Sequence, residues 1–245
     1  QHRASEALLE PDPEAQGRIL GLGITNQRET CLLWDKSNGK PLGPALVWQD
    51  RRSRAWNQLW VDQGLGDEIK DITGLTPDAY FSAGKLCWML ENYPDAKPLL
   101  NRGLLAFGTI DSWLLWKWTG GKVHKTDTSN ASRTLLMDLK QRAWSPKLLQ
   151  LFGIPESILP EIQANHIPFG HMELPLGFGK IPIGSLLGDQ QAALLGQGCI
   201  EAGQTKNTYG TGCFLMQQTG KHLVQSTHGL LSTLAWETAK GPCYA

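Results

Sequence analysis

The sequence predicts an α/β fold in which helices flank a mixed sheet. Short apolar runs over residues 18–25, 30–34 and 45–49 have the length of strands, and a turn signal at 35–40 separates the second run from the third. Segments with apolar residues at helical spacing follow from residue 51 onward. The 245 residues are 41% hydrophobic and 19% charged, so the chain is long and apolar enough to bury a sizeable core.

The first half is expected to be mainly helical after these strands. Residues 1–17 contain two prolines and predict a helix end followed by a loop. Trp56, Leu59 and Trp60 lie on one face of a helix expected over 51–63. Two further helices are expected over 65–72 and 83–93, so that this part of the chain would cover the sheet.

Helix boundaries are better marked in the next part. Thr109 is the expected N-cap of a helix over 110–118 that runs to Gly120-Gly121. Ser145-Pro146 opens a helix over 146–152, which Gly153 ends.

Residues 167–185 are rich in proline and glycine and are expected to be extended. They precede one helix and a series of strands, at 190–198, 205–209, 213–218 and 230–236. The change near 181–185 predicts a domain boundary, with one domain over 1–184 and the start of another over 185–245.

Charge and cysteine content restrict the function. Lys and Arg number 23 and Asp and Glu also number 23, which excludes a strong overall attraction to nucleic acid. The five cysteines show no CxxC spacing, so a disulfide framework is not expected and a reducing, cytoplasmic location fits best. No apolar run reaches the length of a membrane span.

Three polar motifs could carry chemistry. Asp189 lies between Gly188 and the start of a helix, where a carboxylate is favourable, and it would be either a simple N-cap or a catalytic base. The run Gly210-Thr211-Gly212 would be either a plain hairpin turn or a loop whose backbone N–H groups approach a phosphate. Arg28-Glu29 directly follows a strand and would be either an exposed edge or a clamp on a hydroxylated ligand.

Taken together and in order, these motifs resemble the FGGY carbohydrate kinase family. The resemblance covers about residues 18–240 and rests on several long runs, namely 23–30, 47–52, 80–82, 108–114, 126–133, 188–193 and 206–214. It implies a ribonuclease-H-like kinase fold of the actin and hexokinase type, with two domains around a cleft. The run from Asn26 to Thr30, together with Trp48 and Tyr80, points to glycerol as substrate.

The resemblance also implies roles for individual residues. The reaction would be the ATP-dependent phosphorylation of glycerol to glycerol 3-phosphate, with Asp189 as general base and as the carboxylate that holds Mg²⁺. The ATP phosphates would face Gly210, Thr211 and Gly212. The glycerol hydroxyls and carbon backbone would contact seven residues, Arg28, Glu29, Trp48, Tyr80, Asp189, Gln190 and Phe214. Such a polar site rejects analogues that lack a hydroxyl, because its buried groups would be left unpaired.

The sequence departs from the family pattern in several places. The N-terminal phosphate hairpin of the family and its adenine-binding half are not in this sequence, so a fragment that is inactive alone is expected. Residues 176–182 lack the Gly-Gly-x-Arg pattern of an allosteric site, and Ala79 and Gly84 replace the more usual Pro and Thr. Two alternatives stay open: a kinase of another sugar or polyol, and an inactive actin-like binding module. Glycerol and ATP are the expected partners, and the sequence leaves a homo-oligomer open.

Overall fold

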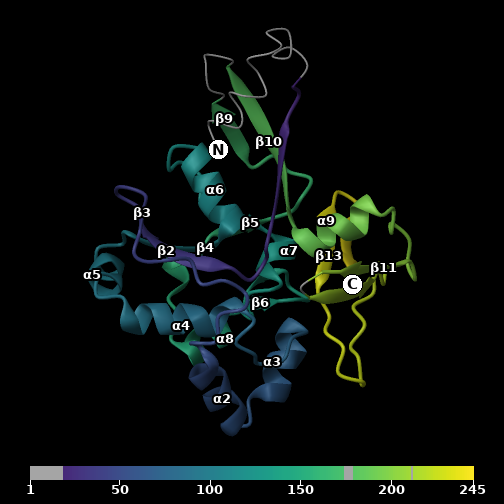
Figure 1. The fold of residues 1–245 in the computed structure, drawn as a ribbon, viewed down its shortest axis with the longest axis horizontal. Coiled ribbons are helices and arrows are strands. Elements are labelled where there is room, and N and C mark those ends of the chain that lie inside the picture. Colours follow the sequence, from purple (N-terminus) through teal and green to yellow (C-terminus); the bar gives the residue numbers. More distant parts are fainter. Residues whose placement is uncertain (1–18, 174–178, 211) are drawn as a thin grey trace.

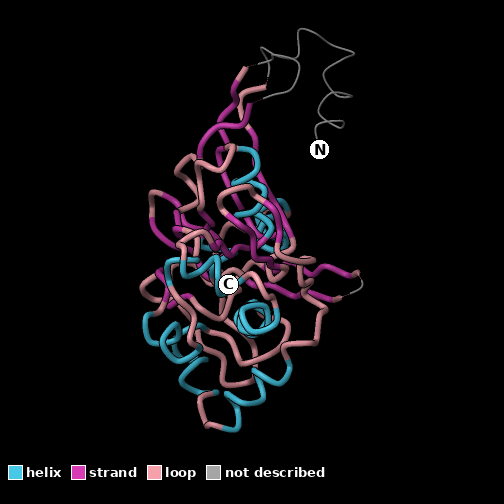
Figure 2. The backbone as a smooth tube through the Cα atoms, turned by 90° about the vertical axis from the view of Figure 1, so that its left-hand side faces the viewer, coloured by secondary structure: helices cyan, strands magenta, loops and turns pink. Residues whose placement is uncertain are grey.

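Strands and helices are mixed along the computed structural model, which describes residues 19–173, 179–210 and 212–245. Figure 1 shows the elements in sequence colours, and Figure 2 shows strands concentrated in the upper part of the molecule and helices in the lower part. The expected helix end within residues 1–17 lies outside the described residues. The first half contains β1 Leu22–Asn26, β2 Cys31–Asp35, β3 Lys40–Pro41, α2 Arg54–Asp62, α3 Gly66–Thr73, α4 Ser82–Asn92, α5 Ala96–Asn101, β4 Leu105–Thr109 and α6 Ile110–Trp118.

In the second half, short elements precede the long strand β10, and a helix and two hairpins follow it. The short elements are β5 Lys125–Asp127, α7 Thr128–Ala131, β6 Met137–Asp138, β7 Ala143–Trp144, α8 Pro146–Phe152, a 3₁₀ turn Glu156–Ile158, β8 Glu161–Gln163 and β9 Gly170–Glu173. Then come β10 Lys180–Gly188, α9 Asp189–Gly196, β11 Thr205–Tyr209, β12 Cys213–Gln217, β13 Leu234–Thr238 and β14 Gly241–Tyr244. The predicted domain boundary at 184/185 falls inside β10, and the division into two domains stays a prediction.

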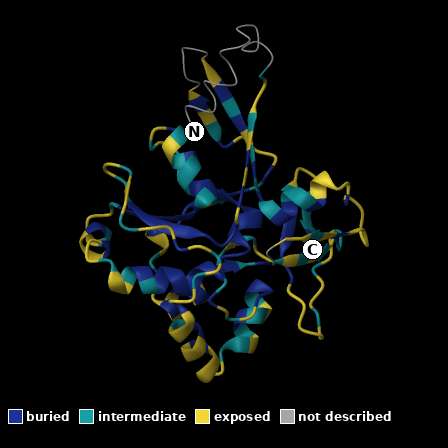
Figure 3. Cartoon of the chain, viewed as in Figure 1, coloured by how far each residue is buried: buried dark blue, intermediate teal, exposed yellow. Residues whose placement is uncertain are grey.

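The β2–β4 sheet is covered on both faces. β2 is the middle strand of a three-stranded sheet in the order β3-β2-β4, and it pairs antiparallel with both neighbours. Cys31 and Leu33 on one face join the largest apolar cluster, which includes residues of α2, α4 and α8. Leu32 and Trp34 on the other face pack with residues of α6. This alternation follows from the period of two residues in a strand. Figure 3 shows β2 and β4 in the dark blue of buried residues.

A second sheet places the functional region. In the order β1-β10-β9, the central strand β10 pairs parallel with β1 and antiparallel with β9, which makes the sheet mixed. Ile24, Ile183 and Leu186 bury their side chains against Leu115 of α6. Two further hairpins, β11–β12 and β13–β14, lie beside α9.

Most expected elements form, but several details differ. The run 45–49 contributes one isolated bridge, Cys31↔Leu46, instead of a third strand. Leu59 of α2 is exposed, because the buried side of this helix is formed by Trp60 and the polar Asn57. Helix α8 begins and ends as predicted, because the Ser145 hydroxyl accepts from Leu148 N–H and Gly153 takes the left-handed conformation.

Candidate active site

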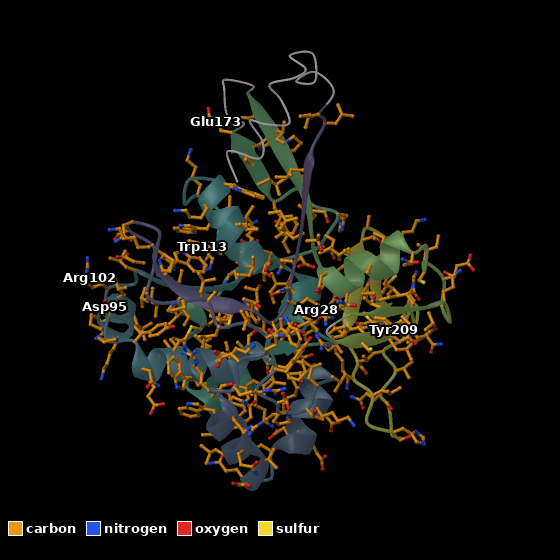
Figure 4. All side chains as sticks on the ribbon, in the orientation of Figure 1. Arg28, Asp95, Arg102, Trp113, Glu173 and Tyr209 are labelled. Carbon is orange, nitrogen blue, oxygen red and sulfur yellow. The ribbon has the colours of Figure 1, made fainter. Side chains whose placement is uncertain are left out.

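The site forms where two parallel strands end. Asn26 at the end of β1 is paired with Gly188 at the end of β10, so the residues that follow both strands emerge at the same edge of the sheet. A turn carrying Arg28 and Glu29 follows β1, and Asp189 begins α9 directly after β10. Ligands of α/β proteins bind at such carboxyl edges. Figure 4 shows Arg28 near the centre of the molecule, between the lower helices and the hairpins that lie beside α9.

A cavity of about 200 Å³ opens at this edge. It collects all seven residues that the sequence assigned to the substrate, although they come from five separate segments. The two described glycines of the predicted phosphate loop also line the cavity. The complete lining consists of Gln27, Arg28, Glu29, Trp48, Tyr80, Asp189, Gln190, Thr208, Gly210, Gly212 and Phe214.

Arg28 is buried, with 3% of its surface exposed, and organises one wall. Its Nη1 donates to Gln191 Oε1 at 3.2 Å, and its Nη2 donates to Tyr80 Oη at 3.4 Å. Its Nε lies 3.5 Å from a Glu29 oxygen and 3.4 Å from an Asp189 oxygen, yet makes no hydrogen bond in the described part of the chain. Burial alone would lower the pKa of Arg28, but Glu29, Tyr80 and Asp189 outweigh it and raise that pKa. Arg28 therefore stays charged.

Gly188 leaves room for this arginine. A Cβ at position 188 would lie 2.6 Å from Arg28 Cγ and 2.7 Å from Arg28 Cδ. Any other residue at the end of β10 would displace the Arg28 side chain from the cavity wall.

Glu29 lies between two arginines. Arg133 Nε donates to its Oε1 at 3.0 Å, and Glu29 itself is 2% exposed. The backbone oxygen of Glu29 accepts from the fully buried Lys85 Nζ at 2.9 Å, and the same ammonium donates to the Tyr80 backbone oxygen at 2.8 Å. Lys85 thus joins the two segments that carry Glu29 and Tyr80.

Aromatic rings form the apolar part of the lining. Trp48 and Tyr80 meet edge to face with their ring centroids 5.8 Å apart. The Arg28 guanidinium carbon lies 5.9 Å from the ring centroid of Phe214. Burial, with the nearby Glu29 carboxylate, raises the pKa of Tyr80, so its phenol keeps its proton and can donate to a ligand.

Asp189 holds a carboxylate at the open side of the cavity. Its side chain is 40% exposed, and its Oδ1 accepts from Gln190 N–H at 2.8 Å. Its Oδ2 accepts no hydrogen bond from the described residues. Gln190 is 9% exposed, and its Oε1 accepts from Lys206 Nζ.

The structure excludes two of the simpler interpretations that the motifs left open, while the functional roles stay predictions. Arg28-Glu29 is not an exposed strand edge, because both residues are buried in a turn. Asp189 is not an N-cap: Gly188 occupies that position and α9 has no side-chain cap. The 210–212 run does connect two strands of a hairpin, and both of its glycines line the cavity. Thr211 lies outside the described residues.

Sequence reasoning missed several residues of this region. Gln27 and Thr208 line the cavity, and Lys206, Gln191, Arg133 and Lys85 support residues that do. A strand-alternation argument would have found two of them: Thr208 is paired with Phe214 in the hairpin, and Lys206 lies two residues before Thr208 on the same face. Lys85 and Arg133 gave no local signal for their contacts with Glu29, because Glu29 is 56 and 104 residues away in the sequence.

Gly84 has a structural explanation that does not involve the cavity. A Cβ at this position would lie 2.5 Å from Asn57 Nδ2 and 3.2 Å from Ser53 Cβ. The glycine therefore allows α4 to approach α2 closely, and it is not part of the cavity lining.

Comparison with known proteins defines the class. The profile of the FGGY family of carbohydrate kinases, N-terminal domain, matches residues 6–196. The chain belongs to this family. The predicted kinase fold is confirmed: a xylulose kinase from Rhodospirillum rubrum covers 98% of the chain with a TM-score of 0.83 at 18% identity.

More similar proteins are glycerol kinases. The chain is 50% identical over 232 residues to the glycerol kinase of Methylibium petroleiphilum. This match covers 95% of the chain and 46% of that protein. It is 51% identical to that of Alkaliphilus oremlandii, over 89% of the chain and 44% of that protein. Plasmodium falciparum glycerol kinase, solved with ADP, has a TM-score of 0.91 at 36% identity and covers 99% of the chain and 50% of its own. The chain spans about half the length of the curated relatives it matches.

Proposed function

We propose that the complete protein phosphorylates glycerol to glycerol 3-phosphate with ATP. The complete protein here means the product of the complete reading frame that carries this chain. The observation that carries the proposal is the cavity of Arg28, Glu29, Tyr80 and Asp189, in which charged and polar groups converge beside an aromatic wall. Its volume of about 200 Å³ favours a ligand of a few heavy atoms, since sites for larger ligands are roughly 300–1,000 Å³. The similarity to glycerol kinases supports the same substrate.

Asp189 is proposed as the general base. Its Oδ2, which accepts no hydrogen bond within the described ranges, would accept the proton of a terminal hydroxyl as that hydroxyl oxygen attacks the γ-phosphorus of ATP. Arg28 would hold the Asp189 carboxylate in place from the buried side, 3.4 Å away. The hydroxyl oxygen would form the new bond to phosphorus while the bond to the β,γ-bridging oxygen breaks and ADP leaves.

The remaining polar groups would orient the polyol. The Glu29 carboxylate accepts hydrogen bonds and the Arg28 guanidinium donates them, so together they match hydroxyl groups, which do both. Trp48 and Phe214 would face the carbon atoms. A polyol held in this way keeps one hydroxyl at Asp189, and phosphoryl transfer depends mainly on such positioning.

The nucleotide is proposed to bind at the other side of the cavity. Gly210, Thr211 and Gly212 would face the phosphates, with the Gly212 backbone N–H as a donor to them; the Gly210 N–H donates to the Gly212 oxygen at 3.2 Å in this structure. In 19–173, 179–210 and 212–245 no three His, Cys, Asp or Glu side chains gather at one point. A single carboxylate such as Asp189 fits Mg²⁺, which is usually bound by one or two carboxylates together with substrate phosphates. When bound, Mg²⁺ neutralises phosphate charge.

The test is a substrate panel on the complete protein. ADP release would be followed with glycerol, xylulose, gluconate and no acceptor. We expect turnover with glycerol that exceeds the others by at least about 100-fold, because a buried polar site rejects ligands that leave it unpaired. Faster turnover of another polyol would reassign the substrate within the family. No ATP-dependent turnover with any acceptor would favour the inactive actin-like alternative.

A further inference from the structure

A buried lysine lies behind the substrate side of the cavity. Lys206 on β11 is 5% exposed and does not line the cavity itself. Its Nζ donates to Gln190 Oε1 and, at 2.7 Å, to Thr208 Oγ1. Both acceptors do line the cavity. The ammonium therefore contacts two groups that a ligand would meet.

This contact determines which end of the Gln190 amide faces the ligand. A glutamine amide carries an oxygen that accepts and an NH₂ that donates, whereas a lysine ammonium only donates. The amide oxygen must therefore face Lys206, which turns the NH₂ group away from it. Within the described residues, the Gln190 Nε2 donates to no protein acceptor.

The adjacent Asp189 has the opposite property, because its carboxylate only accepts. Asp189 and Gln190 thus offer an acceptor and a donor side by side at the start of α9. A ligand hydroxyl group can donate to the Asp189 carboxylate and accept from the Gln190 NH₂ group. A methyl group or a hydrogen atom in place of that hydroxyl can do neither. Without Lys206 the amide could rotate and present its oxygen, which would place two acceptors next to each other.

We propose that Lys206 is a positioning residue that fixes Gln190 as a hydrogen-bond donor to a substrate hydroxyl beside Asp189. This inference rests on the proposed function, since it assigns a task within the same cavity. Lys206 acts through Gln190 and not on the nucleotide. Its removal should therefore weaken polyol binding specifically.

The experiment is a double-mutant cycle on the complete protein. Lys206→Met removes the ammonium at similar length, Gln190→Ala removes the amide, and the double variant removes both. We expect each single variant to raise the glycerol KM about 3- to 10-fold, the range of one net hydrogen bond, with kcat and the ATP KM within about 2-fold. The double variant should be no worse than Gln190→Ala, because Lys206 has no effect once the amide is gone. Lys221→Met, at an exposed lysine, is the matched control.

A second variant keeps the lysine and decides the question if Lys206→Met fails to fold. Gln190→Glu has the same shape and still accepts from Lys206, but it has lost the NH₂ donor. We expect it to raise the glycerol KM as much as Gln190→Ala does. A wild-type glycerol KM in Gln190→Glu would overturn the inference, and so would single effects that multiply in the double variant. If the unchanged protein shows no glycerol turnover, both the proposed function and this inference are overturned. If it turns glycerol over normally but the KM effects of the two single variants multiply in the double variant, only the role of Lys206 is overturned.

Discussion

Arg28 Nε lies 3.4 Å from Asp189 Oδ1, which joins the turn after β1 to the first residue of α9. The guanidinium is buried and its other two nitrogens donate to Gln191 and Tyr80, but in the described part of the chain Nε has no hydrogen-bond acceptor. A buried donor without a partner costs roughly 1–3 kcal/mol. The Glu29 and Asp189 carboxylates, 3.5 and 3.4 Å from Nε, offset part of this cost, so one buried cation holds both carboxylates in place.

Replacing Asp189 with Asn should abolish most turnover but leave glycerol bound. The amide keeps the size of the side chain and cannot accept the hydroxyl proton, a loss of about 10²- to 10⁴-fold for a general base. Single-turnover assays and glycerol titration by calorimetry on the complete protein measure the two effects separately. Asp71→Asn, at an exposed position of α3, is the control. Near-normal turnover in Asp189→Asn would remove this residue from the role.

Changes at Arg28 and Glu29 should affect glycerol more than ATP. Arg28→Ala and Glu29→Ala should each raise the glycerol KM by at least about 10-fold, because charged groups make the stronger hydrogen bonds in a buried site. Glu29→Ala also leaves Arg28 and Arg133 facing each other without their shared carboxylate. Glu29→Gln, which keeps the shape, separates loss of charge from loss of packing. Steady-state kinetics with each substrate varied would measure the split, and equal effects on both KM values would indicate a fold defect.

Lys85 should be required for both stability and glycerol binding. Lys85→Met removes the donor shared by the Glu29 and Tyr80 backbone oxygens, although Ser82 Oγ still donates to Glu29 at 3.3 Å. The unpaired Tyr80 oxygen should lower the free energy of unfolding by about 1–3 kcal/mol. Glycerol KM should rise as well, because both segments carry cavity residues. Urea denaturation and kinetics, with Lys97→Met at an exposed position as control, test the pair of effects; a stability loss with unchanged glycerol KM would restrict Lys85 to the fold.

A buried aspartate should make stability fall as pH rises. Asp111 is fully buried and accepts from Thr109 Oγ1 at 2.5 Å and Thr126 Oγ1 at 2.7 Å. Burial, followed by the nearby Asp127 carboxylate, raises the pKa of Asp111 from 3.8 to about 7. The folded state therefore binds this proton more tightly than the unfolded chain. The resulting stabilisation is complete below about pH 4 and is lost as the pH rises through about 7.

Asp111→Asn removes this titrating group. The free energy of unfolding of the unchanged protein should decrease between pH 5 and pH 8. In Asp111→Asn this decrease should be smaller by at least about 1 kcal/mol. Denaturant titrations across this range measure the difference in slope. Parallel curves for the variant and the unchanged protein would show that Asp111 does not titrate there.

The 245-residue chain by itself should fold in its 18–180 part and phosphorylate glycerol slowly or not at all. The chain spans about half of its relatives, and phosphoryl transfer needs the γ-phosphate held in line with the attacking oxygen. All seven proposed polyol contacts lie within it, so weak glycerol binding is expected. A coupled ADP assay on this chain beside the complete protein makes the comparison. Similar rates would show that these 245 residues hold the phosphates unaided.

The part of the fold that could be predicted is the part with local signals. Ser145, Pro146 and Gly153 determine where α8 begins and ends through their own backbone and hydroxyl preferences. The run 45–49 looked like a strand by the same kind of signal, yet only Leu46 pairs with the sheet. Strand formation needs a partner along its length, and the sequence does not show whether one is present. A bilayer-spanning helix is another feature with a local signal, and in the described part of the chain no helix is long and apolar enough to cross a bilayer.

The motifs by themselves determined the family, because long runs of specific residues identify a family without coordinates. They also predicted which residue types could bind a polyol. Only the tertiary structure decided that Arg28 and Glu29 are buried and that Asp189 is not a helix cap. It also revealed Arg133, whose partner Glu29 is 104 residues away, and Lys85, which holds two backbone oxygens. The contacts with Glu29 depend on how α4 packs against β2 and how α7 packs against β10. No local pattern encodes that arrangement, because the energy of each contact appears only when distant segments meet.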